Sequence, residues 1–232
     1  MIRIENIEVF GWEAAIRGMR NPMNSWDKSD SEFKYPCTSL GQEEEPHYCN
    51  HCGYDMCHPY EGEPKYVLGP KDMDLMKHLI AGGTEHRKFL RMIHIQMDIA
   101  APLYWWKEFD TYKVGTVANG CSTMHRIHAK EFELSDFSHE HMSAGSDDVL
   151  EIIIHCLNGN RKKFLETKDK SYWWQLIQLL PSSYNQRRTV DFNYETAMNI
   201  IRQRTGHKLD EWNQFVDVLK NLPYMKDMIE DD

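Results

Sequence analysis

Four cysteines in one polar segment are the residues whose type and spacing most directly suggest chemistry. In Cys49-Asn50-His51-Cys52-Gly53, two residues separate the thiols. This spacing lets both thiolates bind one zinc ion, and a glycine next to them permits the tight turn around the metal. The segment is too polar to build a hydrophobic core, so a bound metal would stabilise it instead. The pattern predicts a structural zinc site with the ligands Cys37, Cys49, Cys52 and Cys57.

Other interpretations of the cysteine cluster stay open. Because the segment has one C-x-x-C pair, His47, His51 or His58 could replace a cysteine as a ligand. Alternatively, the cysteines are reduced thiols of a cytosolic loop, or a redox pair. Metal analysis of the purified protein separates these interpretations from the zinc site.

A second stretch, from Gly83 to Arg126, combines a strand pattern, a helix pattern and a polar loop. The alternation of apolar and polar residues from Ile93 to Ile99 is typical of a half-buried strand. Pro102 suits the first turn of a helix, because its missing N–H would have no partner there. Small and polar residues then fill the segment 115–125, which we expect to be a loop and a plausible ligand site.

The order of these residues resembles the flavin-dependent thymidylate synthases, the ThyX family. His86 keeps the leading histidine of the family's H-x-T-P-F-E-H element, and Ala101-Pro102 matches the end of the strand that follows. A second block matches independently, with Leu180-Pro181, Asn193 and Arg204 at the family's spacing. The resemblance spans roughly residues 71–219, and Thr111-Tyr112-Lys113 stands where the family has its R-H-R signature.

The resemblance implies an α+β fold, with mixed helices around a small β-sheet, and an activity. We expect a single domain over residues 1–232, in which residues 21–66 form an irregular Cys-rich insertion. The family is homotetrameric, binds FAD, uses NADPH and methylenetetrahydrofolate, and transfers a one-carbon unit to C5 of dUMP. The pyrimidine nucleotide is then the partner of this chain, and its function is methylation or a related modification of that nucleotide. The alternative is a non-catalytic, zinc-stabilised relative that binds nucleotides or serves in an assembly.

The resemblance also implies roles for single residues. Arg204 is the candidate catalytic residue, because a guanidinium opposite a pyrimidine carbonyl stabilises negative charge that develops on the ring. The residues implied for substrate binding are Arg204, Glu108, Asn119, Cys121 and Ser122, and those implied for the cofactor are His86, Tyr112, Lys113, Asn193 and Asn199.

Structural roles compete with these assignments. Arg204 could pair with a carboxylate such as Asp210 or Glu211. Asn193 could simply cap a helix that begins at Tyr194. Lys113 could be a helix-end cation favoured by the helix dipole, and His86 a hydrogen-bonded surface residue.

The arginines that hold the nucleotide phosphate in the family are missing here. Their places are taken by Thr111, Thr123 and Ile177. A phosphate without an arginine fork binds weakly, so the charge would have to come from other positions, for which the candidates are His125, Arg126, Arg187 and Arg188. Cys121, beside Ser122, places a thiol near the expected substrate.

Apolar spacing predicts the remaining elements. A short strand and a helix are expected within residues 2–20, and further helices at 70–83, 171–180 and 194–204, with a last amphipathic helix after Gly206. Another helix is expected to begin at Ser146, and Asn158-Gly159-Asn160 is expected to break it.

Composition narrows the class of protein. The 232 residues carry 27 basic and 36 acidic side chains, and the formal charge of -9 argues against a nucleic-acid surface. No apolar window of about eighteen residues predicts a membrane span, and the first residues do not look like a signal peptide. We therefore expect a soluble, cytoplasmic protein.

Overall fold

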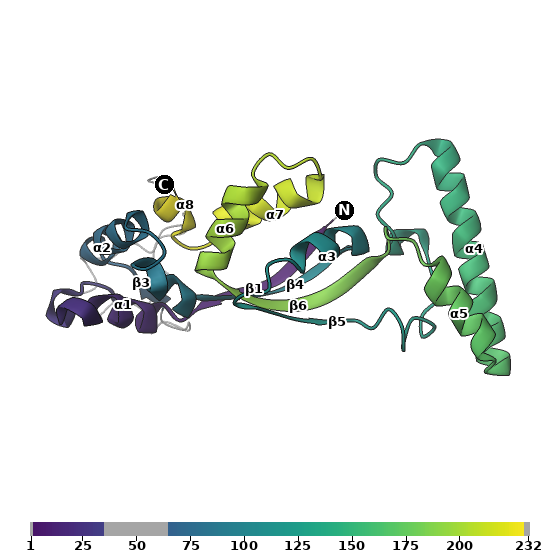
Figure 1. Ribbon diagram of the computed structural model, residues 1–232, viewed down its shortest axis with the longest axis horizontal. Helices are drawn as coiled ribbons and strands as arrows, with labels where there is room; N and C mark the ends of the chain where they lie inside the picture. Colours follow the sequence, from purple (N-terminus) through teal and green to yellow (C-terminus); the bar gives the residue numbers. More distant parts are fainter. Residues whose placement is uncertain (1, 35–64, 230–232) are drawn as a thin grey trace, which may run out of the picture. The chain divides into compact units, whose positions relative to one another are not determined.

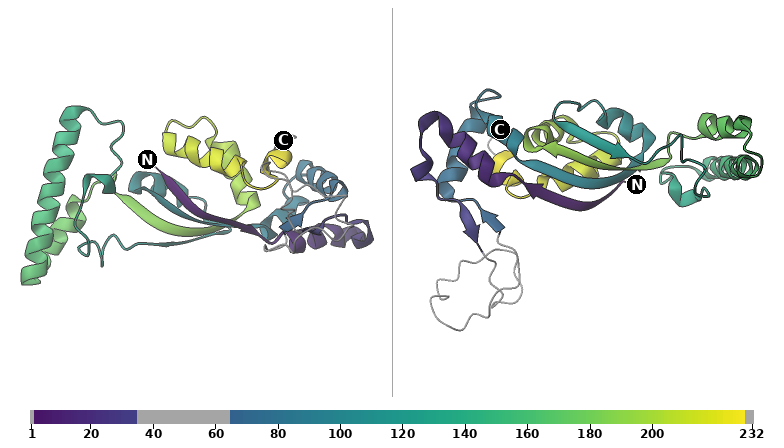
Figure 2. Two further views of the ribbon diagram at one scale, coloured as in Figure 1. Left: turned by 180° about the vertical axis from the view of Figure 1, so that it is seen from behind. Right: turned by 90° about the horizontal axis from the view of Figure 1, so that it is seen from below.

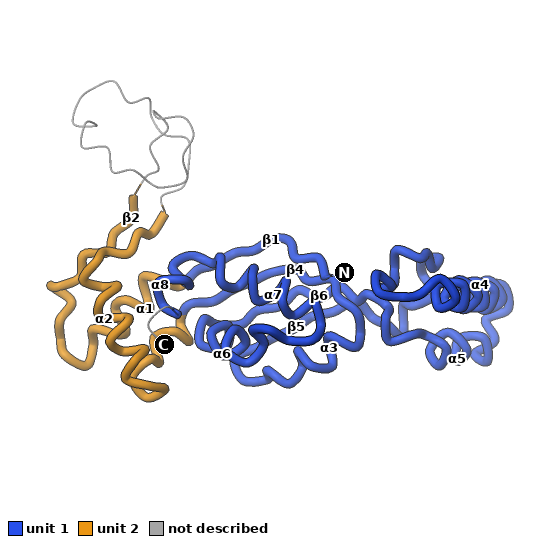
Figure 3. Tube along the Cα trace, turned by 90° about the horizontal axis from the view of Figure 1, so that it is seen from above, with its two compact units in different colours: residues 1–10, 93–229 blue, residues 11–92, 230–232 orange. Residues whose placement is uncertain are grey.

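The computed structural model describes residues 2–34 and 65–229, which form two compact units (Figure 3). Unit 1 consists of Met1–Phe10 and Ile93–Ile229, and unit 2 contains Gly11–Met92. The four predicted zinc ligands, Cys37, Cys49, Cys52 and Cys57, lie outside the described residues.

A four-stranded antiparallel sheet is the centre of unit 1 (Figure 1). Its strands are in the order β1 (Arg3–Phe10), β4 (His94–Pro102), β6 (Asn185–Asn193) and β5 (Thr116–Gly120). β4 confirms the strand predicted from the alternating residues, since Ile95, Met97 and Ile99 are buried. Pro102 is the last residue of this strand and lies one position before the helix it was expected to begin.

Three helices cover one face of this sheet. They are α3 (Leu103–Phe109), α6 (Tyr194–Arg204) and α7 (Asp210–Lys220), and Figure 1 shows them above the strands. Between helices and sheet lies an aromatic core, in which Trp105 contacts Trp212 at 4.8 Å and Phe109 at 5.1 Å between ring centroids. α6 has the bounds predicted from the sequence. A short helix, α8 (Met225–Ile229), ends the described part of the unit.

The other face of the sheet is polar. Figure 2, right, shows it with the strands in front of these helices. Asp98 at its centre accepts hydrogen bonds from Thr189 at 2.5 Å, and from Asn6 and Arg187 at 2.8 Å each. His94 pairs with Asp191 at 3.0 Å. These cross-strand pairs account for the polar residues that alternate with the buried ones.

Two of the four strands were not predicted. β6 has two buried apolar residues, Val190 and Phe192, preceded by polar positions, so it shows little alternation. β5 is an edge strand whose residues are mostly exposed, and residues 116–120 were expected to lie in a loop. That expectation was wrong because an edge strand is held by backbone pairing to one neighbour, which leaves no signal in residue type.

A helical pair extends unit 1 beyond one end of the sheet (Figure 1). α4 (Ala144–Thr167) and α5 (Lys170–Leu179) pack against a small core that contains Ile127, Phe132, Phe137, Leu150, Leu157 and Leu176. α4 starts two residues before the predicted Ser146. The predicted break at Asn158-Gly159-Asn160 is wrong, since α4 is continuous through these residues. The side chain of Asn158 accepts from the backbone N–H of Phe132 at 2.9 Å and donates to its C=O at 2.8 Å, and these two hydrogen bonds hold this part of the helix in place.

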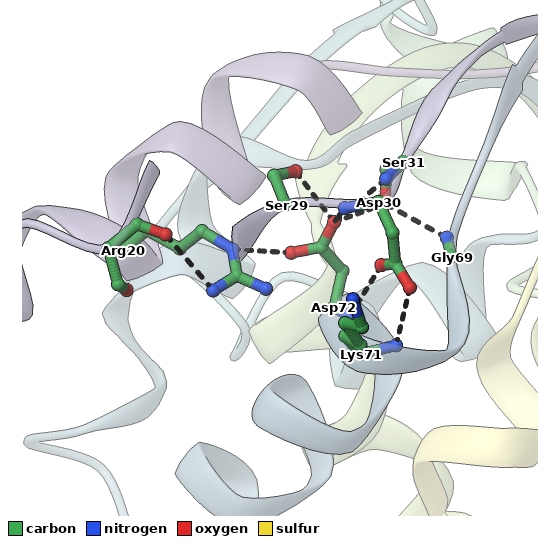
Figure 4. Close-up of polar contacts among 8 residues, drawn as sticks. Arg20, Ser29, Asp30, Ser31, Gly69, Lys71 and Asp72 are labelled. Atoms are coloured by element: carbon green, nitrogen blue, oxygen red, sulfur yellow. Dashed lines mark hydrogen bonds and ion pairs between the residues drawn. The ribbon is translucent and has the colours of Figure 1, made fainter. Parts of the chain in front are cut away.

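Unit 2 contains the predicted helices α1 (Trp12–Arg20) and α2 (Pro70–Ala81). Its other elements are a two-stranded sheet of β2 (Glu32–Lys34) and β3 (Lys65–Val67), and short 3-10 helices at Asn21–Met23, Trp26–Lys28 and Arg87–Met92. Figure 4 shows the buried carboxylate of Asp72, which accepts from Arg20 Nε at 2.6 Å and from Ser29 and Ser31 at 2.7 Å. This carboxylate joins α1, α2 and the segment that leads into β2.

Among the helices that the structure describes, none is long and apolar enough to cross a membrane.

Candidate functional site

Arg204, at the end of α6, lies in a cluster of polar and aromatic side chains. Its Nη1 donates to Oε2 of Glu108 at 2.6 Å, and its Nε donates to the hydroxyl of Tyr112 at 2.9 Å. The guanidinium also lies over the ring of Trp212, 4.5 Å from the centroid. The structure therefore joins Arg204 and Glu108, which the resemblance implied for the substrate, with Tyr112, which it implied for the cofactor.

The local sequence explains this position of Arg204. Ala197 and Ile201 are buried against the core of unit 1, and Arg204 follows Ile201 by three residues on the same side of α6. Glu108 comes from the last turn of α3, and Tyr112 from the turn that follows this helix. The ends of two helices thus meet at the guanidinium.

Glu108 is the shared acceptor of the cluster. Its Oε2 also accepts from the indole Nε1 of Trp212 at 3.0 Å and lies 3.6 Å from Nε2 of His207. The carboxylate that pairs with Arg204 is thus Glu108. The alternatives named from the sequence are wrong, since Asp210 pairs with His141 and Glu211 accepts from Tyr104. Trp212 and His207 were not assigned to a site, because nothing in their spacing marks them as neighbours of Arg204.

The cluster keeps one edge of the guanidinium available. Within the described residues, Nη2 of Arg204 makes no hydrogen bond, and 18% of the side chain is exposed. Nη1 and Nε are held by Glu108 and Tyr112, so the orientation of the guanidinium is fixed in advance. A fixed donor of this kind can stabilise negative charge on a bound carbonyl oxygen.

A second group of predicted residues lines an open cavity of about 320 Å³ at the sheet edge. Cys121 and Ser122 line it together with His125 and Arg188. Asn119 is not among the lining residues. It lies between the lining residues Ala118 and Gly120 on β5, opposite Thr189 of β6, and successive residues of a strand point to opposite faces of the sheet.

Arg188 is the cation that is best placed in this cavity. It lies over the Trp106 ring at 4.2 Å from the centroid, and it donates to Asp110 at 2.7 Å and to Gln186 at 2.9 Å. Of the four candidates named for a phosphate, Arg188 and His125 line the cavity. Arg187 is the next residue on β6 and pairs with Asp98 on the opposite, polar face of the sheet. Arg126 is not among the lining residues.

The turn after β5 is closed by Ser122. Its hydroxyl accepts from the backbone N–H of His125 at 2.9 Å and of Met124 at 3.3 Å. Gln186 Nε2 donates to the carbonyl of Cys121 at 2.5 Å and ties the turn to β6. The Cys121 thiol is free and exposed.

The residues implied for the cofactor are distributed more widely. Asn193 caps α6, because its side chain accepts from the N–H of Thr196 at 3.0 Å, which bears out the structural alternative. Lys113 is exposed after α3, and Asn199 is half-buried on α6. His86 is exposed in unit 2, in the turn before the 3-10 helix at Arg87–Met92. Within residues 2–34 and 65–229, no three His, Cys, Asp or Glu side chains are grouped to hold a metal.

No protein-family model and no curated protein sequence matches this chain. Solved structures do. A thymidylate synthase X (ThyX) from Helicobacter pylori, crystallised with FAD and dUMP, matches 100% of this chain and 99% of its own length at a TM-score of 0.64 and 14% identity. The chain has the ThyX fold.

Two further structures agree with this assignment of the fold. A second crystal structure of the H. pylori ThyX, also complexed with FAD and dUMP, gives a TM-score of 0.62 over 97% of this chain and 99% of that one, at 14% identity. A UMP/dUMP methylase, PolB from Streptomyces cacaoi, bound to 5-Br UMP, gives 0.53 at 12% identity and covers 69% of this chain and 82% of that one. The predicted α+β, ThyX-like fold is thus confirmed, although the R-H-R signature is absent.

Proposed function

We propose that this protein methylates a pyrimidine nucleotide in a flavin-dependent reaction. Three structures that share its fold were solved with a pyrimidine nucleotide, and two of them also with FAD. The observation that carries the proposal is the convergence of Arg204, Glu108 and Tyr112. The resemblance implies the same residues for the substrate or the cofactor.

In this proposal Arg204 binds the base. Its Nη2 donates to a pyrimidine carbonyl oxygen and stabilises the negative charge that this oxygen carries while the ring is activated as a nucleophile at C5. Glu108 and Tyr112 act through Arg204, because they hold Nη1 and Nε and so fix the plane of the guanidinium. Trp212 packs against its face and restricts access of water.

The phosphate of the nucleotide is assigned to the cavity that Cys121 and Ser122 line. Arg188 supplies positive charge there and His125 an imidazole that can hydrogen-bond the phosphate, in place of the family arginines that this chain lacks. Arg188 already donates to Asp110, so a phosphate has to compete with this carboxylate. We therefore expect weaker phosphate binding than an arginine fork provides.

The described residues fit a flavin in part. Lys113 presents an exposed cation and Asn199 a partly exposed amide, whereas Asn193 and Tyr112 already use their oxygen atoms inside the chain. Thr116 Oγ1, one residue after Gly115, is buried, has no hydrogen-bond partner among residues 2–34 and 65–229, and can donate to a bound group. FAD would supply the electrons for the one-carbon transfer, with NADPH and methylenetetrahydrofolate as cosubstrates.

The proposal extends to assembly and to the Cys-rich segment. One chain presents few free polar groups to a flavin, which is consistent with a homotetramer whose subunits share each site. The Cys-rich segment 21–66 is then an insertion in a single ThyX-like domain, with zinc bound by Cys37, Cys49, Cys52 and Cys57.

The visible absorption spectrum after addition of excess FAD and desalting tests the proposal. A retained flavin band, followed by dUMP-dependent turnover that Arg204→Ala abolishes, is the expected result. Arg202→Ala, an exposed position two residues earlier on α6, is the matched control and retains activity. Full activity of Arg204→Ala would show that the site is assigned to the wrong residue.

One observation favours a second function. The phosphate-binding arginines of the family are replaced by Thr111, Thr123 and Ile177, so the chain could bind a nucleotide without catalysing its methylation. A protein that stays colourless but binds dUMP in calorimetry would have this function.

A further inference from the structure

His207 lies beside Arg204 with a hydrogen-bond donor directed at each of its two ring nitrogens. Nη1 of Arg204 lies 3.1 Å from Nε2, and the backbone nitrogen of Leu209 lies 3.2 Å from Nδ1. A neutral imidazole carries a proton on one nitrogen and accepts at the other, and an imidazolium accepts at neither. His207 can therefore accept from Arg204 or from Leu209, but not from both.

The turn after α6 fixes the position of this imidazole. Gly206 has a φ of +73°, in the left-handed region, and turns the chain back so that the N–H of His207 donates to the carbonyl of Arg204 at 3.1 Å. Asn213 Nδ2 donates to the carbonyl of His207 at 2.8 Å, and the ring centroids of His207 and Trp212 are 6.2 Å apart. The imidazole is thus held at the end of α6, with 25% of the side chain exposed.

The strength of the two hydrogen bonds decides from which donor the imidazole accepts. Arg204 is a cation, and a hydrogen bond from an ionised donor is about twice as strong as one between neutral groups, such as that from the backbone of Leu209. Within the described part of the chain, Arg204 and Glu108 are the charged groups that contact the imidazole, and Glu108 Oε2, at 3.6 Å, is too far from Nε2 for a hydrogen bond. The favoured tautomer of His207 therefore carries its proton on Nδ1 and accepts at Nε2. The N–H of Leu209 is then left without this acceptor.

This tautomer leaves Arg204 with one nitrogen that no described residue occupies. One hydrogen of Nη1 donates to Glu108 and the other to His207, and Nε donates to Tyr112. An anion with two oxygens binds a guanidinium through two nitrogens at once, either Nη1 with Nη2 or Nε with Nη2. In each pair one nitrogen of Arg204 is already occupied, so Nη2 is left to bind a single carbonyl oxygen.

We propose that His207 is a positioning residue for Arg204, and that it limits the guanidinium to one pose by accepting the second hydrogen of Nη1. The inference rests on the proposed function in one respect, namely that the ligand of Nη2 is the carbonyl of a pyrimidine base. The tautomer of His207 does not depend on that function, and it can be measured in the protein without a ligand.

NMR of the full chain, labelled at the histidine nitrogens, tests the tautomer. Wild-type His207, assigned by the loss of its signals in His207→Gln, should show a protonated Nδ1 and an unprotonated Nε2 at neutral pH. In Arg204→Met the cation is absent, and the proton should move to Nε2 because Nδ1 then accepts from Leu209. Circular dichroism checks that this variant is folded, and the wild-type spectrum decides by itself if it is not. A proton on Nε2 in the wild type, or the same tautomer in both folded proteins, overturns the proposal.

Kinetics with dUMP separates this role from the proposed function. His207→Phe keeps a ring without an acceptor and should lower kcat by more than about tenfold with a smaller change in KM, because the orientation of the guanidinium is lost rather than binding. His207→Gln should lose much less, since its amide oxygen can take the place of Nε2. Equal losses of kcat in the two variants overturn the positioning role. A wild type without turnover would overturn the proposed function but not this inference, which the tautomer then decides.

Discussion

Nη1 of Arg204 donates to Oε2 of Glu108 at 2.6 Å, although 96 residues separate the two in the chain. The indole of Trp212 donates to the same oxygen. One carboxylate oxygen thus holds the end of α6, the start of α7 and the end of α3 together, and the orientation of the candidate catalytic guanidinium depends on it.

Replacing Glu108 should destabilise the protein, and by more when the hydrogen-bond acceptor is lost. Glu108→Gln keeps an acceptor for Trp212 and Arg204 and should lower the free energy of unfolding by about 1 kcal/mol, whereas Glu108→Ala removes the acceptor and should cost about 2 kcal/mol. Urea unfolding measures both. Glu166→Gln, an exposed acid on α4, is the control. A cost for Glu108→Ala no larger than that of the control would contradict the role of this carboxylate.

Asp72 is expected to be a large contributor to the stability of unit 2. It is fully buried and paired with Arg20, so Asp72→Ala leaves a buried guanidinium without its carboxylate and should cost about 3–5 kcal/mol. Hydrogen exchange of α1 and α2 amides locates the effect. Glu13→Ala removes a surface pair with Arg17 and should cost less than about 0.5 kcal/mol. Equal losses in the two variants would show that the buried network is not stabilising.

Asp98 should make the stability of the protein depend on acid pH. Hydrogen bonds from Thr189, Arg187 and Asn6 hold the pKa of Asp98 well below its ordinary value of 3.8. A carboxyl with a lowered pKa contributes stability above its ordinary pKa and loses that contribution as the pH falls through the lowered value. Asp98→Asn should therefore destabilise the protein at neutral pH and reduce the acid dependence of the urea midpoint below pH 3.8. Wild-type and variant curves that stay parallel down to strongly acid pH would refute this.

Gly115 should not tolerate a side chain. Its φ is +72°, and a Cβ would lie 2.4 Å from Nδ2 of Asn193, the residue that caps α6. Gly115→Ala should cost about 2 kcal/mol, from the left-handed backbone and the disturbed cap. Gly145→Ala on α4 is the control, since a Cβ there meets nothing within 4 Å. Thermal unfolding compares the two, and a Tm for Gly115→Ala equal to that of the control would be the contrary result.

The sequence predicts the elements that bury a regular apolar stripe. β4 is such an element, because its buried residues Ile95, Met97 and Ile99 repeat every two positions. α6 is another, because its buried residues Ala197 and Ile201 are one helical turn apart. β5 and β6 were missed because an edge strand, and a strand with a polar outer face, are fixed mainly by backbone pairing. α4 continues through Gly159 because contacts far away in the chain, such as Asn158 with Phe132, outweigh local propensity.

For the candidate site, too, some residues could be predicted from the sequence and others could not. The resemblance implied Arg204 and Glu108 for the substrate and Tyr112 for the cofactor. The residue that neutralises Arg204 could not be read from the sequence, because the acids Asp210 and Glu211 lie closer to it in the chain than Glu108 does. The meeting of Arg188 with Cys121 depends on the register of β5 against β6, in which Gly120 is opposite Arg188. A shift of one residue would have put Arg188 on the other face of the sheet.

The pairing of β1 with β4 has a topological consequence. Phe10 and His94 are cross-strand partners, so the chain leaves the sheet after Phe10 and re-enters it opposite the same point. The segment Gly11–Met92 is thus an insertion between the two strands of what is otherwise a β-hairpin. Insertions are best tolerated where the two ends of the added segment already lie together. A tight two-residue turn could close the same hairpin, so the strand order of the sheet does not depend on the inserted unit.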